Sequence, residues 1–428
     1  MRVREFISKL EGARDLAVVD FEVSRDQIPL MIKVEEGRQN RAILFRKIRG
    51  HAVPVIANLY GSYARYAMAI GADEKNVWNK IENAIANPVK SKTTTDAPCF
   101  EVIHNNPDIM EILPLVQYHS LDAGPYLTSG ILFMKDPLSG RRNISFMRHM
   151  IKGPRKVGFN PKSIHNKAYY QKIALAGKRM EVAICVGVPT EMVVAGAQWI
   201  PDEKDEVDVA CALAEVADRS ELAMAKCQTV DIEVPAGTEM VIEGVVSTEL
   251  EPEGPFGDWT GAYARPQMKP TLDITCVSHR KDFVYETIMP ADSKEQIILK
   301  IVRFSPEIEQ IRSRYPEVLR TAVPEYALGR LLVIAIDKSD RILEIMRAFL
   351  KIQCINRVVV VNSDVDVDSA EDVMWAISNR ILEDKKVIAE PCVDEWWNHL
   401  KLGIDTTVDL NDIRHKRPTL FPFQGRTA

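Results

Sequence analysis

The sequence predicts an α/β protein whose β-rich central part is flanked by two parts that alternate helices and strands. The length of 428 residues, 46% of them apolar and 27% charged, suffices for two or three globular domains. Helix and strand patterns alternate over residues 1–95, short β-rich runs dominate residues 98–290, and the alternation returns after about residue 330. Many short strands with few helices are typical of a barrel or a sandwich.

The N-terminal part is expected to be closed by the polar loop over residues 87–95. Before that loop, apolar spacing and β-branched runs predict a helix over residues 3–10, strands over 16–19, 42–45 and 53–60, and helices over 63–71 and 74–86.

The central part is expected to consist mostly of short strands separated by turns. The β-rich runs cover residues 100–103, 126–134, 181–188, 192–197, 238–246 and 272–278. A hairpin turn is expected over residues 136–140, where Asp-Pro-Leu-Ser-Gly combines turn-forming residues, and a helix over residues 205–217.

The C-terminal part is expected to hold a parallel sheet. Its patterns predict a strand over residues 331–336, a helix over 341–352, a strand over 357–361, a helix over 373–381 and a strand over 386–389. This β-α-β-α-β order predicts parallel strands, because they need crossover connections.

Charge and apolar patterning exclude several classes of protein. The formal net charge is −5, with no concentrated basic face of the kind that binds nucleic acid. No apolar run approaches the ~18–20 residues of a membrane span, and residues 1–7 lack an apolar signal core, so a cytoplasmic protein is expected. The seven cysteines form no Cys-x-x-Cys pair, which favours buried free thiols over disulfides or zinc.

Glu253 and Asp258 stand at the two ends of a Glu-Gly-Pro-Phe-Gly-Asp stretch. Gly254 and Gly257 let another group approach the backbone closely, and with the proline they hold a non-helical path. Two carboxylates in one loop can have their proton affinities pushed apart, so that one serves as an acid. Taken alone, the stretch favours an ordinary hairpin turn with solvated acids.

A second informative stretch covers residues 143–148, directly after the expected hairpin turn. Its side chains alternate as on a strand, which places Arg148 beside an aromatic residue on a mostly apolar face. A buried arginine needs a carboxylate partner or a ligand. On this stretch alone, a structural salt bridge is the default interpretation.

Taken together, the two stretches resemble the UbiD family of decarboxylases, which use prenylated FMN. The family pattern is Asn, then Arg five residues later, then far downstream Glu-Gly-Pro-(Phe/Tyr)-Gly-(Glu/Asp); here these are Asn143, Arg148 and residues 253–258. Further segments that resemble the family are residues 227–236, 239–244 and 401–407. The likeness covers nearly the whole chain. It implies an N-terminal α/β domain over residues 1–97, a split β-barrel prenylated-FMN-binding domain over 98–307, and a C-terminal α/β oligomerisation domain over 308–428.

The resemblance implies that Arg148, Glu253 and Asp258 form the catalytic set. Arg148 would grip the substrate carboxylate, Glu253 would orient Arg148, and Asp258, where the family often has Glu, would donate the proton. A carboxylate that leaves as CO₂ needs an electron sink, which these side chains cannot supply and a modified flavin can.

The resemblance also implies a divalent metal, Mn²⁺ or Mg²⁺, held by Asn143, His165 and Glu206 and bridging to the cofactor phosphate. Potassium is a further candidate ion. Rivals of Glu206 as the carboxylate ligand are Asp205, Asp208 and Glu215. The residues expected to contact the cofactor are Thr128, Asn143, Ser145, Phe146, Met147, Arg148, His165, Glu206 and Lys401.

The expected function is reversible decarboxylation of an aromatic, heteroaromatic or α,β-unsaturated carboxylic acid, with a flavin prenyltransferase as cofactor supplier and a homodimer or homohexamer as the assembly. One alternative within the family is decarboxylation of anhydromevalonate phosphate, for which Lys294, Lys300 and Arg303 could bind a phosphate. Another is a non-catalytic flavin-binding or assembly protein, against which the intact catalytic set speaks.

Overall fold

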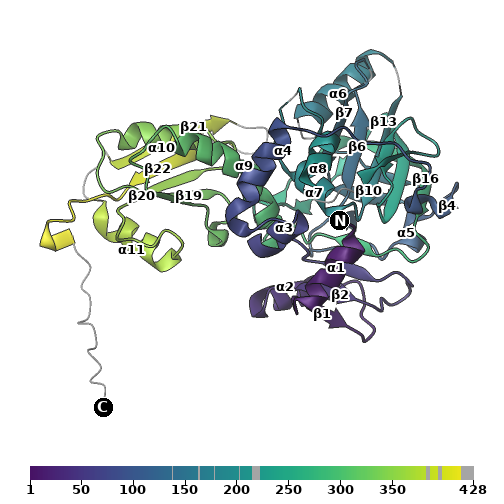
Figure 1. Ribbon diagram of the computed structural model, residues 1–428, viewed down its shortest axis with the longest axis horizontal. Helices are drawn as coiled ribbons and strands as arrows, with labels where there is room; N and C mark the ends of the chain where they lie inside the picture. The colour runs from purple at the N-terminus through teal and green to yellow at the C-terminus, as the bar shows by residue number, and fades with distance from the viewer. Residues whose placement is uncertain are drawn as a thin grey trace. The chain divides into compact units, whose positions relative to one another are not determined.

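The structure is a computed structural model in which the chain forms two compact units, Met1–Arg303 and Phe304–Ala428 (Figure 1). It describes residues 1–136, 138–161, 164–177, 179–201, 203–214, 222–381, 386–393 and 398–415. The expected α/β class is confirmed by a mixed N-terminal sheet, a curled antiparallel central sheet and a C-terminal sheet with parallel strands. The domain boundaries expected at residues 97 and 307 stay a prediction.

The first part of the larger unit is a mixed sheet with helices around it. Its elements are α1 (Val3–Gly12), β1 (Leu16–Val19), α2 (Gln27–Arg38), β2 (Ala42–Phe45), β3 (Val55–Ala57), α3 (Tyr63–Ala69), η1 (Glu74–Asn76) and α4 (Val77–Ala86). The sheet runs β1-β2-β3-β17, in which β17 (Tyr285–Thr287) arrives from the end of the central part. α1 is the expected amphipathic helix, and it buries Val3, Phe6 and Leu10.

Helix α2 is not predicted by the sequence patterns. Its charged residues are not confined to one face: Glu35 and Glu36 are buried, and they pair with Arg41 at 2.7 Å and Lys33 at 3.0 Å. Pro29 stands in the first turn, where its missing N–H costs no helical hydrogen bond. The buried charges blur the apolar periodicity from which a helix is predicted.

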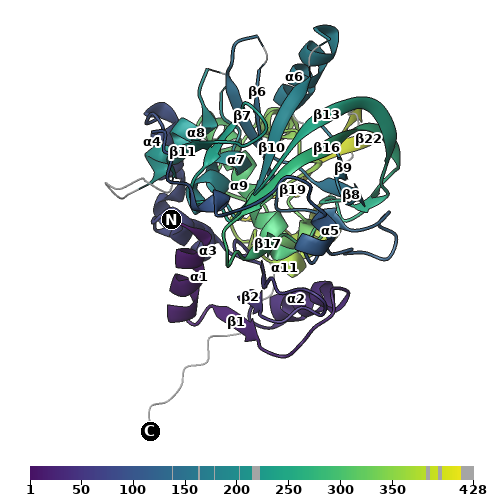
Figure 2. The same cartoon turned by 90° about the vertical axis from the view of Figure 1, so that its right-hand side faces the viewer.

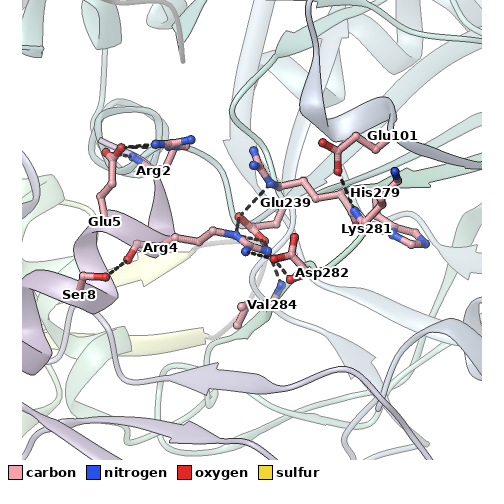
Figure 3. Close-up of polar contacts among 11 residues, drawn as sticks. Arg2, Arg4, Glu5, Ser8, Glu101, Glu239, His279, Lys281, Asp282 and Val284 are labelled. Atoms are coloured by element: carbon pink, nitrogen blue, oxygen red, sulfur yellow. Dashed lines mark hydrogen bonds and ion pairs between the residues drawn. The ribbon is translucent and has the colours of Figure 1, made fainter.

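An ion-pair cluster ties α1 to the central sheet (Figure 3). Arg4 donates from Nε and Nη2 to the two oxygens of Glu239 at 2.9 and 3.0 Å, and it pairs with Asp282 at 2.7 Å. Glu239 is fully buried and also accepts the N–H of Val284 at 2.9 Å. The N-terminal helix is therefore fixed to the end of the central sheet.

The central elements include long strands, short hairpins, four α-helices and one 3₁₀ helix within the described residues. They are η2 (Pro98–Phe100), β4 (Val102–His104), α5 (Ile109–Ile112), β5 (Tyr126–Leu127), β6 (Ile131–Lys135), β7 (Arg142–Phe146), β8 (His149–Gly153), β9 (Lys156–Gly158), α6 (Ile164–Leu175), β10 (Met180–Val186), α7 (Thr190–Ala197), α8 (Glu206–Leu213), β11 (Met224–Lys226), β12 (Glu233–Pro235), β13 (Met240–Glu253), β14 (Phe256–Gly257), β15 (Tyr263–Ala264) and β16 (Gln267–His279). The main sheet is antiparallel in the order β5-β8-β9-β16-β13-β10-β6-β7, with β4 also paired to β16.

The central sheet curls along its two long strands, β13 and β16, which lie side by side (Figure 2). The pairing register shifts between Glu243 and Gly244 and again between Val246 and Leu250. A Cβ on Gly244 would lie 2.5 Å from the carbonyl oxygen of Asp273, so glycine is required at the first shift. Such irregularities bend a strand and increase its twist. The expected split barrel is thus a curled half-barrel.

The β-rich pattern predicts a strand over residues 192–197, and this prediction is wrong because these residues form most of α7. Nearly all of the run is buried, and a short apolar run cannot be assigned to strand or helix by periodicity. Thr190 and Glu191 supply the first turn. Helices α7 and α8 pack on each other and on β7 (Figure 1), so α8, which begins at Glu206, lies against the strand that carries Asn143.

The smaller unit is built around the sheet β18-β19-β20-β22-β21. The last elements of the chain are α9 (Lys294–Arg312), β18 (Arg320–Ala322), η4 (Glu325–Ala327), β19 (Leu331–Ala335), α10 (Ile342–Leu350), β20 (Arg357–Val361), α11 (Ala370–Arg380), β21 (Val387–Val393), β22 (Asn398–Asp405) and η6 (Ile413–His415). β19 and β20 are parallel as expected. The third expected strand, over residues 386–389, falls in β21, which is not parallel: it pairs antiparallel with β22, since the few residues between them cannot form a crossover. The third parallel strand is instead β22, which the sequence patterns do not predict. Among the described helices, none has the length and apolar character needed to cross a membrane.

Candidate active site

Arg148, Glu253 and Asp258 meet in one ion-pair cluster. Arg148 precedes β8, Glu253 ends β13, and Asp258 follows β14. Arg148 Nε and Nη2 donate to the two oxygens of Glu253 at 3.0 and 3.2 Å, and Nη1 donates to Asp258 Oδ2 at 2.8 Å. The carboxylate side chains are only 3% and 7% exposed, so these charge-assisted hydrogen bonds act where water screens them little.

Residues 253–263, which we call the acidic loop, form a tight hairpin in which β14 pairs with β15. Gly254 has a φ of +92°, a conformation that favours glycine. Asp258 donates its N–H to Ala262 O at 2.9 Å, and Trp259 donates its N–H to Asp258 Oδ1 at 2.7 Å. The loop therefore holds the Asp258 carboxylate in a defined position beside the guanidinium.

Aromatic rings form the apolar side of the cluster. The Arg148 guanidinium lies 4.4 Å from the centre of the Phe256 ring, which in turn lies 4.4 Å from the Tyr126 ring. Burial lowers the pKa of Arg148, but Glu253 and Asp258 outweigh burial and hold that pKa above its ordinary value. Burial also raises the pKa of the Tyr126 phenol, which keeps it neutral. The site therefore consists of the Arg148 guanidinium held between two carboxylates, with aromatic rings packed against it.

Asn160 belongs to this cluster although the sequence patterns do not single it out. Its Nδ2 donates to Glu253 Oε2 at 3.2 Å, and its Oδ1 has no hydrogen-bond partner within the described part of the chain. A Cβ on Gly158 would lie 3.6 Å from Glu253 Cγ, so β9 also borders the carboxylate. The contact joins residues far apart in the sequence, and no local pattern could report it.

A second polar cluster lies between β7 and the start of α6. His165 Nδ1 donates to Asn143 Oδ1 at 2.9 Å. Asn143 Nδ2 donates to Asn166 Oδ1, and Asn166 Nδ2 donates to Ser145 Oγ, both at 2.8 Å. Two of the three predicted metal ligands are therefore in contact. Asn166 completes the cluster and was not among the predicted residues, although it directly follows His165.

Glu206, the third predicted ligand, lies close to this cluster. Glu206 begins α8, which packs on β7, the strand that carries Asn143. Burial raises the pKa of Glu206 to about 7, and its Oε2 has no hydrogen-bond partner among the described residues. The rival Glu215 lies outside the described residues.

The other two rivals are engaged in ion pairs. Asp205 caps α8 by accepting a backbone N–H in the first turn, and it pairs with Arg142 at 2.8 Å. Asp208 is buried and pairs with Lys90 at 2.6 Å. Of the three described candidates, Glu206 is the one whose carboxylate has an oxygen available to a metal.

The donor set suits a hard divalent cation. Among the described residues, no group of three His, Cys, Asp or Glu side chains could hold a metal ion. The predicted set of Asn143, His165 and Glu206 is not a group of this kind, because one of its three ligands is the amide oxygen of Asn143. A carboxylate, an amide oxygen and one imidazole suit Mn²⁺ or Mg²⁺. The buried Oε2 of Glu206, which no described residue hydrogen-bonds, fits such an ion.

The remaining predicted cofactor contacts lie on several elements. Thr128 Oγ1 accepts the N–H of Ile288 at 3.3 Å, and Phe146 and Met147 lie between Ser145 and Arg148 in the chain. Lys401 lies on β22 of the smaller unit, where its Nζ donates to two backbone carbonyls at 2.7 Å. Their contacts with a cofactor stay predictions.

Comparison with known proteins identifies the family. Successive parts of the chain match the N-terminal, Rift-related and C-terminal domains of 3-octaprenyl-4-hydroxybenzoate carboxy-lyase, at residues 7–85, 90–293 and 300–391. An evolved dimeric form of the UbiD-class enzyme HmfF from Pelotomaculum thermopropionicum, solved in complex with prFMN, is 31% identical, with a TM-score of 0.87 over 98% of this chain and 97% of that chain. The chain belongs to the UbiD family.

Two further relatives are less similar in sequence. The anhydromevalonate phosphate decarboxylase of Methanothermobacter thermautotrophicus is 27% identical over 91% of this chain and 90% of its own. The vanillic acid decarboxylase of Sedimentibacter hydroxybenzoicus is 23% identical, with a TM-score of 0.81 over 98% of this chain and 95% of that chain, and shares the fold. The chain is thus related to carboxy-lyases over nearly its whole length.

Proposed function

We propose that this protein is a prFMN-dependent reversible decarboxylase of an aromatic, heteroaromatic or α,β-unsaturated carboxylic acid. The observation that carries the proposal is the buried cluster in which Arg148 is hydrogen-bonded to both Glu253 and Asp258. A guanidinium that is already oriented is a site for a carboxylate. The prFMN complex of the HmfF relative supports the assignment of the cofactor.

Arg148 is proposed to bind the substrate carboxylate by exchange. Glu253 occupies one edge of the guanidinium through Nε and Nη2, whereas Asp258 contacts Nη1 alone. A substrate carboxylate can take Nη1 from Asp258 while Glu253 and Asn160 keep the guanidinium oriented. One anion replaces another at the cation, so the buried charge of Arg148 remains compensated.

This exchange would also prepare Asp258 to donate a proton. In the structure, Asp258 accepts one hydrogen bond from Arg148 and another from the N–H of Trp259. Hydrogen bonds to the charged form favour ionisation, so losing the contact with Arg148 favours the neutral acid. A neutral carboxyl group in a water-poor site is a suitable general acid for the carbon that loses CO₂.

When bound, prFMN would supply the electron sink that no side chain of this site provides. Asn143, His165 and Glu206 would hold a divalent cation, Mn²⁺ or Mg²⁺, against the cofactor phosphate. Glu206 Oε2, which has no hydrogen-bond partner among the described residues, and the contact between Asn143 and His165 support this assignment.

Co-expression with a flavin prenyltransferase is expected to convert an almost inactive protein into an active one, because the side chains of the site include no electron sink. CO₂ release from a panel of aromatic, heteroaromatic and α,β-unsaturated acids measures the change. The protein expressed without the prenyltransferase is the control. Full activity in a preparation free of flavin would reject the proposed function.

Replacing Glu206 by glutamine is expected to remove bound metal and most of the flavin, because the amide keeps the shape but loses the anionic ligand. Metal analysis and flavin absorbance per protein chain measure the loss. Asp208→Asn is the matched control, since Asp208 lies on the same helix, is also buried and is paired with Lys90. Loss of metal in Asp208→Asn with retention in Glu206→Gln would reject Glu206 as the ligand.

Anhydromevalonate phosphate is the second candidate substrate, and one observation favours it. Lys300 on α9 lies over the Trp259 ring, with its Nζ 3.5 Å from the Trp259 carbonyl oxygen. A cation therefore lies against Trp259, the residue that follows Asp258 in the chain, where it could bind a phosphate on the substrate. A substrate panel that includes phosphorylated unsaturated acids separates the two candidates, because a Lys300→Ala variant should lose activity only toward the phosphorylated ones.

A further inference from the structure

We propose that Asp122 is a positioning residue that holds the acidic loop so that Asp258 reaches Arg148. This inference rests on the proposed function, because it assigns Asp122 a part in the same reaction. Asp122 has no sequence motif around it and lies more than a hundred residues before the acidic loop. Its side chain is fully buried, and the structure brings it to the backbone of that loop.

The contacts of the Asp122 carboxylate join two segments of backbone. Oδ1 accepts the N–H of Gly257, the residue directly before Asp258, at 2.7 Å in a buried hydrogen bond. Oδ2 accepts the N–H of His119 at 2.9 Å. A buried carboxylate is costly unless it is hydrogen-bonded, and hydrogen bonds to a charged group are the stronger kind. The carboxylate therefore fixes the Gly257 amide firmly.

Neighbouring residues add contacts between the same two segments. Ala123 donates its N–H to the carbonyl oxygen of Pro255 at 2.9 Å, and Leu121 donates its N–H to the hydroxyl of Tyr263 at 3.2 Å. Residues 119–123 thus contact the acidic loop on both sides of its turn, at Pro255 and Gly257 before the turn and at Tyr263 after it.

The imidazole ring of His119 packs directly against Gly257. A Cβ on Gly257 would lie 2.5 Å from His119 Nδ1 and 2.9 Å from Cε1, so the loop lies directly on the imidazole ring. The imidazole ring limits how closely the loop can approach residues 119–123, and Asp122 fixes the direction of the Gly257 N–H. Both constraints act on the residue before Asp258.

This placement has a catalytic consequence. Asp258 reaches Arg148 Nη1 at 2.8 Å from a backbone that Asp122 holds one residue earlier. A misplacement of a reacting group by about 1 Å can cost roughly 10²-fold in rate. Asp122 touches neither Arg148 nor Glu253 in the contacts described above, so its removal should act on the chemical step through Asp258 and spare substrate capture.

The test compares Asp122→Ala with Asp136→Ala in the holoenzyme. Asp136 is as buried as Asp122, with 6% exposure for each residue, and its carboxylate also accepts a backbone N–H, that of Leu138, at 2.9 Å. It lies at the hairpin between β6 and β7 and not at the acidic loop. Hydrogen–deuterium exchange of residues 253–263 is measured beside kcat, KM and flavin content.

For Asp122→Ala we expect faster exchange over residues 253–263 and a loss of kcat of about 10²-fold. KM and flavin content should change by less than about threefold. Asp136→Ala should change neither the exchange of the acidic loop nor kcat. Asp122→Asn keeps an oxygen acceptor for the Gly257 amide and should restore kcat to within about tenfold of the wild type.

Unchanged exchange in Asp122→Ala would overturn the inference, as would faster exchange with normal kcat or an equal effect in Asp136→Ala. If Asp122→Ala does not fold, Gly257→Ala replaces it. Its methyl group should displace the loop from the imidazole, and a second change, His119→Ala, should restore kcat. No rescue would overturn the inference. An inactive wild-type holoenzyme would overturn the proposed function, whereas the exchange data would still decide whether Asp122 holds the loop.

Discussion

Replacing Arg148 by alanine is expected to lower kcat/KM by roughly 10²–10⁴-fold. Removing one partner of a buried ion pair costs about 3–5 kcal/mol, and each 1.36 kcal/mol is a factor of ten in rate. The change removes the carboxylate clamp and leaves Glu253 and Asp258 as neighbouring buried acids without their cation. Steady-state kinetics of the holoenzyme measures the loss.

Arg4→Ala is the matched control. Arg4 also pairs with one buried glutamate, Glu239, and one aspartate, Asp282, but in the first turn of α1 and not in the site (Figure 3). It should lower the thermal stability and leave kcat/KM nearly unchanged. Arg148→Lys should recover little activity, because an ammonium cannot engage Glu253 and a substrate carboxylate through two separate edges. Near-normal kinetics in Arg148→Ala would contradict the proposed role.

Replacing Asp258 by asparagine is expected to lower kcat by roughly 10²–10⁴-fold, the usual contribution of a general acid. Asparagine keeps the shape and an acceptor oxygen for Arg148 and the Trp259 N–H, so cofactor and substrate should still bind. Turnover is measured together with titration of the acid substrate. Near-normal turnover would show that the proton comes from another group, with Glu253 or an ordered water as the next candidates.

Much of the fold could be predicted from local patterns, since most elements have their own periodicity or turn residues. Helix α1 and strands β1, β2, β19 and β20 fall close to their predicted positions. The failures have physical causes. Residues 192–197 are apolar on all sides and look alike as strand or helix, and α2 hides its periodicity by burying Glu35 and Glu36 in ion pairs.

The candidate site was predictable only in part. Asn143, Arg148, Glu253 and Asp258 carry a pattern of spacing, and the structure brings the last three into one cluster. The residues that support this cluster carry no such pattern. Asn160 and Asp122 act through hydrogen bonds across 93 and 135 residues of chain, and such contacts leave no local trace in a single sequence.

The division of roles between Arg148 and Asp258 is tested most directly by exchange of ¹³C-labelled bicarbonate into the carboxyl group of an acid that the holoenzyme decarboxylates. In the proposed reaction, cleavage of the carbon–carbon bond precedes protonation of the carbon. We therefore predict that Asp258→Asn still exchanges the label at a rate near that of the wild type, although it forms product roughly 10²–10⁴-fold more slowly, and that Arg148→Ala exchanges almost none. Loss of exchange in Asp258→Asn, or persistent exchange in Arg148→Ala, would contradict these roles.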